Sequence, residues 1–179
     1  MIYSVNDFFD DFDSLRNHAI SLDYKGEVNP LDGVFYPDVS TDVPDPWFWF
    51  LCEYLNAENP FAFFRLTTNG TSEAPHQAHN DSLMGKNTAL IYINEGVGGT
   101  SILKHKEAGL TMGVETQEEL NIWRRDMNNY DAWDILEMID LEPNKLIFYP
   151  SYLMHRAEPV GGFGDNPING RLVLTMFYD

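Results

Sequence analysis

The chain has 179 residues, of which 44% are hydrophobic and 14% aromatic, so it can bury a substantial core and is not a disordered segment. Its 11 Lys and Arg against 28 Asp and Glu give a net charge of −17, which disfavours phosphate backbones and anionic membrane surfaces as partners. This length predicts one domain over residues 1–179.

Cysteine usage and hydropathy indicate a compartment. The single Cys52 excludes an intramolecular disulfide and suits a reducing environment. It lies in an aromatic run, which favours a core position over a nucleophile. No apolar run approaches the ~20 residues that span a bilayer, and the N-terminus has no basic region followed by an apolar one. We therefore expect a cytoplasmic protein without a signal peptide.

The first 58 residues alternate between apolar and turn-rich stretches. We expect a strand at 2–5, a helix at 6–22, a loop at 23–46 and a second helix at 47–56. Asn6 is the predicted cap of the first helix, and Asp45 with Pro46 marks the start of the second. The second helix begins with the run Trp47-Phe-Trp-Phe-Leu51, which is apolar all round and predicts burial against a sheet.

From residue 59 the pattern changes to that of strands. We expect strands at 61–68, 88–94, 100–104, 133–141, 145–149 and 171–178, with a turn at Asn69-Gly70. Residues 88–104 are predicted to form a hairpin. An insertion at 105–131 interrupts the strands, and Thr116 and Glu119 within it have the spacing of a capping box that opens a helix at 116–127.

Together these elements predict a fold that is mainly β with α. Its core, residues 59–179, is expected to be a double-stranded β-helix, that is, a cupin-like jelly roll, with the helices of residues 1–58 packed outside.

His79 and Asp81 form the first candidate site. In an extended segment, side chains two residues apart point to the same side, roughly 6.6 Å from each other along the backbone. An imidazole nitrogen and a carboxylate oxygen could therefore meet at one point. One further histidine would complete two nitrogens and one oxygen, a set typical of non-haem Fe(II) oxygenases.

His155 and Arg171 are the candidates to complete the site. His155 follows an apolar strand and turn, a setting in which a hydrogen-bonded core histidine is more common than a ligand. Arg171 opens the last strand, where it would be either a surface residue or a clamp whose planar fork matches a carboxylate. Of the other histidines, His105 has a Lys-His-Lys context that favours a solvated position, and His76 lacks a ligand partner two residues on.

The order of these motifs resembles the Fe(II)/2-oxoglutarate-dependent dioxygenases, and in particular the branch with the prolyl 4-hydroxylases. The matching motifs are His79-x-Asp81, Tyr92-Ile-Asn94, Gly98-Gly99-Thr100, His155 followed by Pro159-Val160, and Gly170-Arg171. Gly98 to Lys106 and Trp133 to His155 also resemble a group of short oxygenase-like proteins from bacteria and phages.

The resemblance implies a role for each residue. His79, Asp81 and His155 would bind Fe(II), and Arg171 would bind the far carboxylate of the co-substrate 2-oxoglutarate. With O2, such an enzyme hydroxylates an unactivated C–H bond and releases succinate and CO2. Val173 stands where related families carry a co-substrate-binding Ser or Thr. Thr175 could stand in for that residue, and Tyr92 for the tyrosine that prolyl hydroxylases carry ahead of the metal motif.

Two other classes of function stay open. The first is a jelly-roll protein that binds metal or serves a structural role without turnover. The second is a zinc hydrolase, since two histidines and a carboxylate also suit Zn²⁺. Arg171 discriminates, because a hydrolase needs no clamp for a dicarboxylate.

The substrate is expected to be a small molecule or a peptide, and the resemblance favours a peptidyl or amino-acid side chain. We expect residues 105–131 and the glycine-rich loop 161–170 to form the rim of the active site, because long insertions in compact domains are commonly binding loops.

Overall fold

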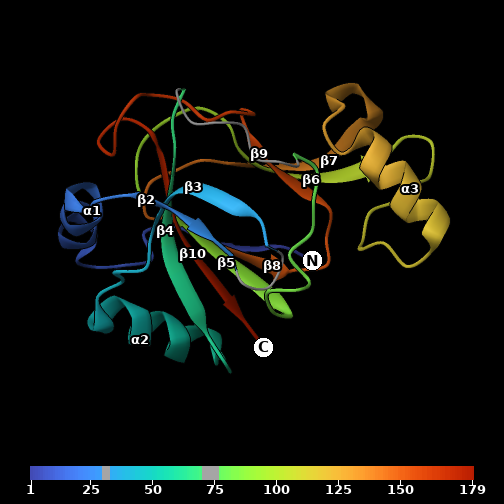
Figure 1. Cartoon of the computed structure of the whole chain (residues 1–179). Helices are drawn as coiled ribbons and strands as arrows, with labels where there is room; N and C mark the ends of the chain where they lie inside the picture. The colour runs from blue at the N-terminus through green and yellow to red at the C-terminus, as the bar shows by residue number, and fades with distance from the viewer. Residues whose placement is uncertain (30–32, 70–76) are drawn as a thin grey trace.

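The computed structural model describes residues 1–29, 33–69 and 77–179, and its strands form two antiparallel sheets (Figure 1). The larger sheet contains, in spatial order, β1 (Tyr3–Val5), β8 (Leu146–Pro150), β5 (Asn87–Tyr92), β10 (Arg171–Tyr178), β4 (Phe61–Thr67), β3 (Phe35–Ser40) and β2 (Lys25–Val28). The smaller sheet contains β7 (Trp133–Asp140), β6 (Gly99–His105) and β9 (His155–Glu158). Gly70 of the predicted turn and His76 lie outside the described residues.

The two sheets share a buried apolar cluster on their facing sides. Leu90 and Val173 of the larger sheet pack there with Ile102 and Ile139 of the smaller one. On each strand the residues of this cluster alternate with residues of the opposite face, as the pleat of a strand requires. The predicted class, mainly β with α and with a double-sheeted jelly-roll core, is confirmed.

Two helices cover the outer face of the larger sheet, as Figure 1 shows. In α1 (Phe12–Ser21) Leu15 and Ala19 are buried, and in α2 (Asp45–Leu55) Leu51 and Cys52 are. All four belong to one core cluster with apolar residues of β4, β5 and β10. The expected packing of the N-terminal helices outside the core, with Cys52 buried, is therefore confirmed.

The predicted burial of α2 against a sheet is found, along one side of the helix only. Trp49, Phe50 and Tyr54 are each at least half exposed. A helix that lies on the outer face of a sheet can bury only the stripe that faces the sheet, however apolar the rest of its surface is.

The first helix begins six residues later than Asn6. Phe8 and Phe9 are buried there instead, and their backbones bind Asn144 in the turn before β8. The Asn144 side chain accepts from the Phe9 amide at 2.8 Å and donates to the Phe9 carbonyl at 2.9 Å. These long-range bonds take up the amides that a helix beginning at residue 6 would leave without partners.

Residues 23–46, expected to be a loop, contain the two strands β2 and β3. These lie at the edge of the larger sheet, and β3 meets β4 only at Val39 and Ser40. All four residues of β2 are exposed. Strands that bury so little show almost no alternation of apolar and polar residues in the sequence. Pro37 within β3 also argues against a strand, but β3 pairs with β4 only at Val39 and Ser40, so Pro37 has no strand partner on that side.

The predicted hairpin at 88–104 is wrong as well. β5 pairs with β8 and β10 in the larger sheet, whereas β6 pairs with β7 and β9 in the smaller one. The chain crosses between the sheets at Gly98 and Gly99. Gly98 has a φ of 86°, and a Cβ at Gly99 would collide with the Ile139 carbonyl oxygen. The glycines therefore mark a crossover rather than a hairpin turn.

The insertion 105–131 carries α3 (Gln117–Asp126), with the predicted capping box between Thr116 and Glu119, and a 3₁₀ turn at Tyr130–Ala132. His105, expected to be solvated, is buried. Its Nε2 lies 3.0 Å from Asp126 Oδ2, and its Nδ1 accepts from the Ala108 amide. Successive side chains of a strand point to opposite faces, so the histidine between two exposed lysines points to the buried face.

The insertion also holds the segment that leads to His79. Trp123 Nε1 donates to the Ala78 carbonyl at 2.8 Å, and the Ala78 amide donates to the Met127 carbonyl at 2.9 Å.

Across the described residues, no helix is both long and apolar enough to cross a bilayer.

We predict that Asn144→Gly lowers the free energy of unfolding by about 1–3 kcal/mol, because it leaves the buried Phe9 amide without a partner. Glycine keeps the positive φ of 60° at this position, so the backbone is not strained. The measurement is urea denaturation. Asn56→Gly is the matched control, since Asn56 also has a positive φ of 50° but ends α2 through its backbone. Equal losses in the two variants would contradict the prediction.

Candidate metal centre

His79 and His155 are brought together by a two-residue antiparallel bridge. The His79 amide donates to the His155 carbonyl at 3.0 Å, and the His155 amide donates to the His79 carbonyl at 2.8 Å. His155 is the first residue of β9, so the segment around His79 extends the smaller sheet by one short pairing. The Asp81 amide, two residues on, donates to the Ser151 carbonyl at 2.8 Å. Backbone pairing thus places all three residues.

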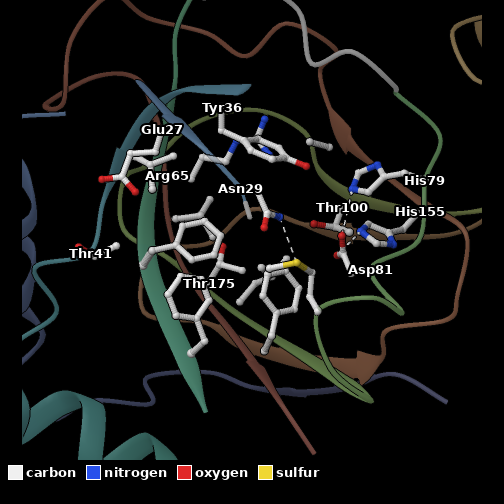
Figure 2. Close-up of a pocket in the computed structure, with 18 of the residues that line it drawn as sticks. Glu27, Asn29, Tyr36, Thr41, Arg65, His79, Asp81, Thr100, His155 and Thr175 are labelled. Atoms are coloured by element: carbon white, nitrogen blue, oxygen red, sulfur yellow. Dashed lines mark hydrogen bonds and ion pairs between the residues drawn. The ribbon is translucent and has the colours of Figure 1, made fainter. Parts of the chain in front are cut away.

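The three side chains converge on one point. Their ligand atoms all lie within 4.8 Å of one another, a spacing that could hold a metal ion. His155 Nε2 is 3.1 Å from Asp81 Oδ2, and His79 Nε2 is 3.7 Å from Asp81 Oδ1. Figure 2 shows both rings directed at the carboxylate. The predicted convergence of His79, Asp81 and His155 is what the structure has.

A backbone carbonyl orients each of the two imidazoles through its Nδ1 atom. His79 Nδ1 lies 2.9 Å from the Gln77 carbonyl, and His155 Nδ1 lies 2.9 Å from the Leu153 carbonyl. A carbonyl can only accept, so each Nδ1 carries the proton in the neutral ring. The lone pair is then on Nε2, the atom that faces Asp81. Metal-binding histidines are commonly fixed by this kind of hydrogen bond.

The charges in the centre favour an ionised carboxylate. Burial raises the pKa of Asp81, but His155 and His79 outweigh it and bring that pKa to about 2. Burial lowers the pKa of His155, but Asp81 outweighs it and the pKa is raised. The carboxylate is therefore anionic at neutral pH and competent as an oxygen ligand.

The centre opens into a cavity of about 390 Å³ between the two sheets. Alternate residues of β10 line it, and so do alternate residues of β4: Phe61, Phe63, Arg65, Arg171, Val173, Thr175 and Phe177. The edge strand β2 and its neighbour β3 contribute further lining residues, among them Glu27 and Tyr36. Strands that the sequence did not predict therefore build one wall of the site.

Arg171 lies in this cavity and not on the surface. Its side chain is buried, with the residue 5% exposed. Nη2 donates to the Gly99 carbonyl at 3.3 Å, and Nε has no hydrogen-bond partner within the described residues. The buried Tyr149 hydroxyl, which lines the same cavity, also lacks a partner there. Buried donors without partners are rare in proteins, so these groups suit a bound ligand rich in acceptors.

The remaining predicted residues differ in their placement. Thr175 lines the cavity, two residues from Val173 on the same face. Tyr92 is fully buried, its hydroxyl lies 2.8 Å from Thr100 Oγ1, and it is not among the described residues that line the cavity. This placement puts Tyr92 behind Thr100, where it would support a ligand-binding surface and not touch the ligand.

Sequence reasoning missed Arg65, Tyr149 and the contribution of β2 and β3. A signal for Arg65 exists, because it is the one charge in the apolar strand Phe61–Thr67 and shares its face with Phe61 and Phe63. The expected rim is wrong, since neither 105–131 nor 161–170 supplies a residue to the described cavity lining. Residues 105–131 instead support the segment before His79 through Trp123.

Comparison with solved structures identifies proteins of the same fold. A prolyl-4-hydroxylase from Pseudomonas putida aligns with a TM-score of 0.54 and 14% identity, over 99% of this chain and 91% of that one. HygX from Streptomyces hygroscopicus, with nickel and 2-oxoglutarate bound, aligns with a TM-score of 0.54 and 11% identity, over 99% and 82%. HygX with iron bound gives 0.52 and 12%, over 98% and 80%.

This chain has the fold of these proteins. No family model matches the sequence, and no curated protein is significantly similar to it. The likeness therefore lies in the arrangement of the chain and not in overall sequence. The resemblance read from the ordered motifs is confirmed at the level of the fold.

We predict that His79→Ala, Asp81→Ala and His155→Ala each abolish tight Fe(II) binding without unfolding the protein, because each removes one of three converging ligand atoms. Asp81→Glu should also fail, since the longer side chain moves the oxygen by on the order of 1.5 Å. Isothermal titration under anaerobic conditions measures the affinity. His18→Ala is the control, because His18 lies on α1 and binds the Asp42 carbonyl. Unchanged affinity in all three alanine variants would exclude this centre.

Proposed function

We propose that this protein is a non-haem Fe(II)- and 2-oxoglutarate-dependent dioxygenase. It hydroxylates an unactivated C–H bond of a peptidyl or amino-acid-like substrate and releases succinate and CO2. One observation carries the proposal: the converging His79, Asp81 and His155 share a cavity with the buried Arg171, whose Nε has no partner among the described residues.

The residues of the centre fit an iron ion. Two imidazole nitrogens and one carboxylate oxygen on one side of a metal form the facial triad of non-haem Fe(II) oxygenases. His79, Asp81 and His155 would hold the ion and leave its other positions to exchangeable ligands. When bound, the iron supplies the O2 chemistry. The hydrogen bonds from Nδ1 to the Gln77 and Leu153 carbonyls keep both imidazoles in the ligating tautomer.

Arg171 fits the co-substrate. A guanidinium matches a carboxylate with two parallel hydrogen bonds, and in a buried site the pair is strongly favoured over an unpaired cation. Arg171 would hold the far carboxylate of 2-oxoglutarate. Thr175 on the same strand and Tyr149 on β8 offer hydroxyls to the same cavity. HygX, which shares this fold, has been crystallised with 2-oxoglutarate.

The walls of the cavity suit this chemistry. Phe63, Leu90, Val173 and Phe177 line it, and apolar walls exclude water from the reacting centre. The volume of about 390 Å³ lies near the lower end of the roughly 300–1,000 Å³ of small-molecule sites. The cavity therefore has room for the co-substrate and a small second molecule or a single side chain.

The sequence also bears on the class of substrate and on the cellular compartment. The charge of −17 disfavours a nucleic-acid substrate, and the single cysteine suits the cytoplasm. We also infer a single domain over residues 1–179. Its support is that β1, β2 and β3, from the first 58 residues, pair in the same sheet as β4, β5, β8 and β10.

A metal-binding jelly roll without turnover and a zinc hydrolase are the alternatives, and one measurement separates them from the proposal. We predict that anaerobic addition of Fe(II) followed by 2-oxoglutarate gives a weak visible charge-transfer band, because the co-substrate would reach the metal directly. Succinate alone, which lacks the keto group, is the control. A protein that binds iron and gives no band with 2-oxoglutarate would contradict the proposal.

We predict that Arg171→Ala weakens 2-oxoglutarate binding by roughly a hundred- to several-thousand-fold, since an unpaired buried carboxylate costs ~3–5 kcal/mol. Arg171→Lys should rescue part of the affinity, because the charge is kept and the bidentate fork is lost. Iron affinity should stay nearly unchanged in both. Titration of the charge-transfer band gives the constants, and Arg124→Ala on the exposed side of α3 is the control. An unchanged dissociation constant in Arg171→Ala would refute this role.

A further inference from the structure

Arg65 is a second cationic group in the cavity. It lies on β4 directly opposite Val173 of β10, so Arg171, two residues along β10, is its diagonal neighbour on the same face. Diagonal Cα positions on paired strands are about 7–8 Å apart. The proposed co-substrate needs only one of these two guanidinium groups for its far carboxylate. The other needs a separate explanation.

The two guanidinium groups diverge across the sheet. Arg171 lies towards β5 and β6, where Nη2 donates to the Gly99 carbonyl and Cζ is 5.9 Å from the Tyr92 ring centroid. Arg65 lies towards β3, where its Cζ is 4.9 Å over the Tyr36 ring. Because β5 and β3 lie on opposite sides of the β10–β4 pair, the two guanidinium groups lie towards opposite sides of that pair.

No side-chain carboxylate within the described residues lies within 4.0 Å of the Arg65 guanidinium. Asp81 and Asp38 act on it only through longer-range attraction, and Asp81 already contacts both histidines of the metal centre. A partly buried cation with an aromatic ring on one side is well placed to bind an anion that enters the cavity. Figure 2 shows Arg65 beside Tyr36, on the other side of the view from His79, Asp81 and His155.

An aromatic surface continues from Arg65 along the same faces of β4 and β10. The ring centroids of Phe61 and Phe63 are 5.5 Å apart, and those of Phe63 and Phe177 are 6.0 Å apart. All three residues line the cavity. A molecule whose acidic group binds Arg65 would therefore rest an apolar body on these rings.

We propose, resting on the function proposed above, that the substrate is a small carboxylic acid with an apolar body, free amino acids of that kind included. Arg65 binds its carboxylate and the surface formed by Phe61, Phe63 and Phe177 binds its body. A side chain within a peptide, which has no carboxylate of its own next to the apolar group, would leave Arg65 without a partner. The free acid is thus favoured over the peptidyl substrate.

The test compares an acid with its neutral amide. The probe pairs are 3-phenylpropanoate with 3-phenylpropanamide and 4-methylpentanoate with 4-methylpentanamide, each titrated into the protein loaded with Fe(II) and 2-oxoglutarate under anaerobic conditions. The variants are Arg65→Gln, Arg65→Lys and, as a charge-matched control on the exposed side of α3, Arg124→Gln. Dissociation constants are measured by ligand-observed NMR, and that of 2-oxoglutarate by the charge-transfer band.

We expect the wild-type protein and Arg124→Gln to bind at least one acid about tenfold or more tighter than its amide, as a charge-assisted hydrogen bond gives. Arg65→Gln should lose that preference, and Arg65→Lys should keep part of it. The 2-oxoglutarate constant should change less than about threefold in Arg65→Gln, which separates this site from the Arg171 clamp. In air, the preferred acid should stimulate succinate release in the wild type and not in Arg65→Gln.

Three results would overturn the inference: no acid binds, acid and amide bind equally, or the preference survives in Arg65→Gln. Loss of 2-oxoglutarate binding in Arg65→Gln with retention in Arg171→Ala would also overturn it, because Arg65 would then be the co-substrate clamp. Absence of the charge-transfer band in the wild type refutes the proposed function by itself. If such a protein still binds the acid more tightly than its amide, and Arg65→Gln removes that difference, the role of Arg65 in binding an anion is supported independently of the proposed function.

Discussion

The site depends on the two hydrogen bonds between the backbones of His79 and His155. They join residues 76 positions apart in the chain and set the separation and tilt of the two imidazoles before any metal is considered. Asp81 then reaches the same point because it follows His79 by two residues and is held by the Ser151 carbonyl. Placing ligands by backbone pairing keeps their geometry precise, since a strand has far less freedom than a loop.

The support of that bridge comes from an element that does not touch the cavity. Trp123 and Met127, at α3 and its end, bind both backbone groups of Ala78, the residue before His79. The buried pair His105 and Asp126 ties α3 in turn to β6. The insertion therefore supports the backbone next to His79 in the candidate metal centre. Residues of β2 and β3, at one end of the larger sheet, line the cavity instead.

Two paired strands divide the chemistry of the cavity between them. β10 presents Arg171 and Thr175, and β4 presents Arg65 with its aromatic neighbours, all on one face because side chains alternate along a strand. The opposite face of the same strands packs against α1 and α2 in the main core. One face of each strand thus belongs to the main core, and the other carries the polar side chains of the cavity, so substitutions of Arg65, Arg171 or Thr175 leave the contacts of the main core in place.

By itself the sequence determined the class of fold and most strand positions, and it predicted that His79, Asp81 and His155 converge and that Arg171 is a candidate for the same site. These rest on local periodicity and on ordered motifs, which short stretches carry in full. Only the tertiary structure decided that β5 and β6 lie in different sheets, that β2 and β3 contribute to the cavity wall, that His105 is buried, and that Arg65 is the diagonal neighbour of Arg171 on the cavity face. Those outcomes depend on which distant segments pair, as at Asn144 and Phe9, and pairing energy between segments far apart leaves no periodic trace in either one.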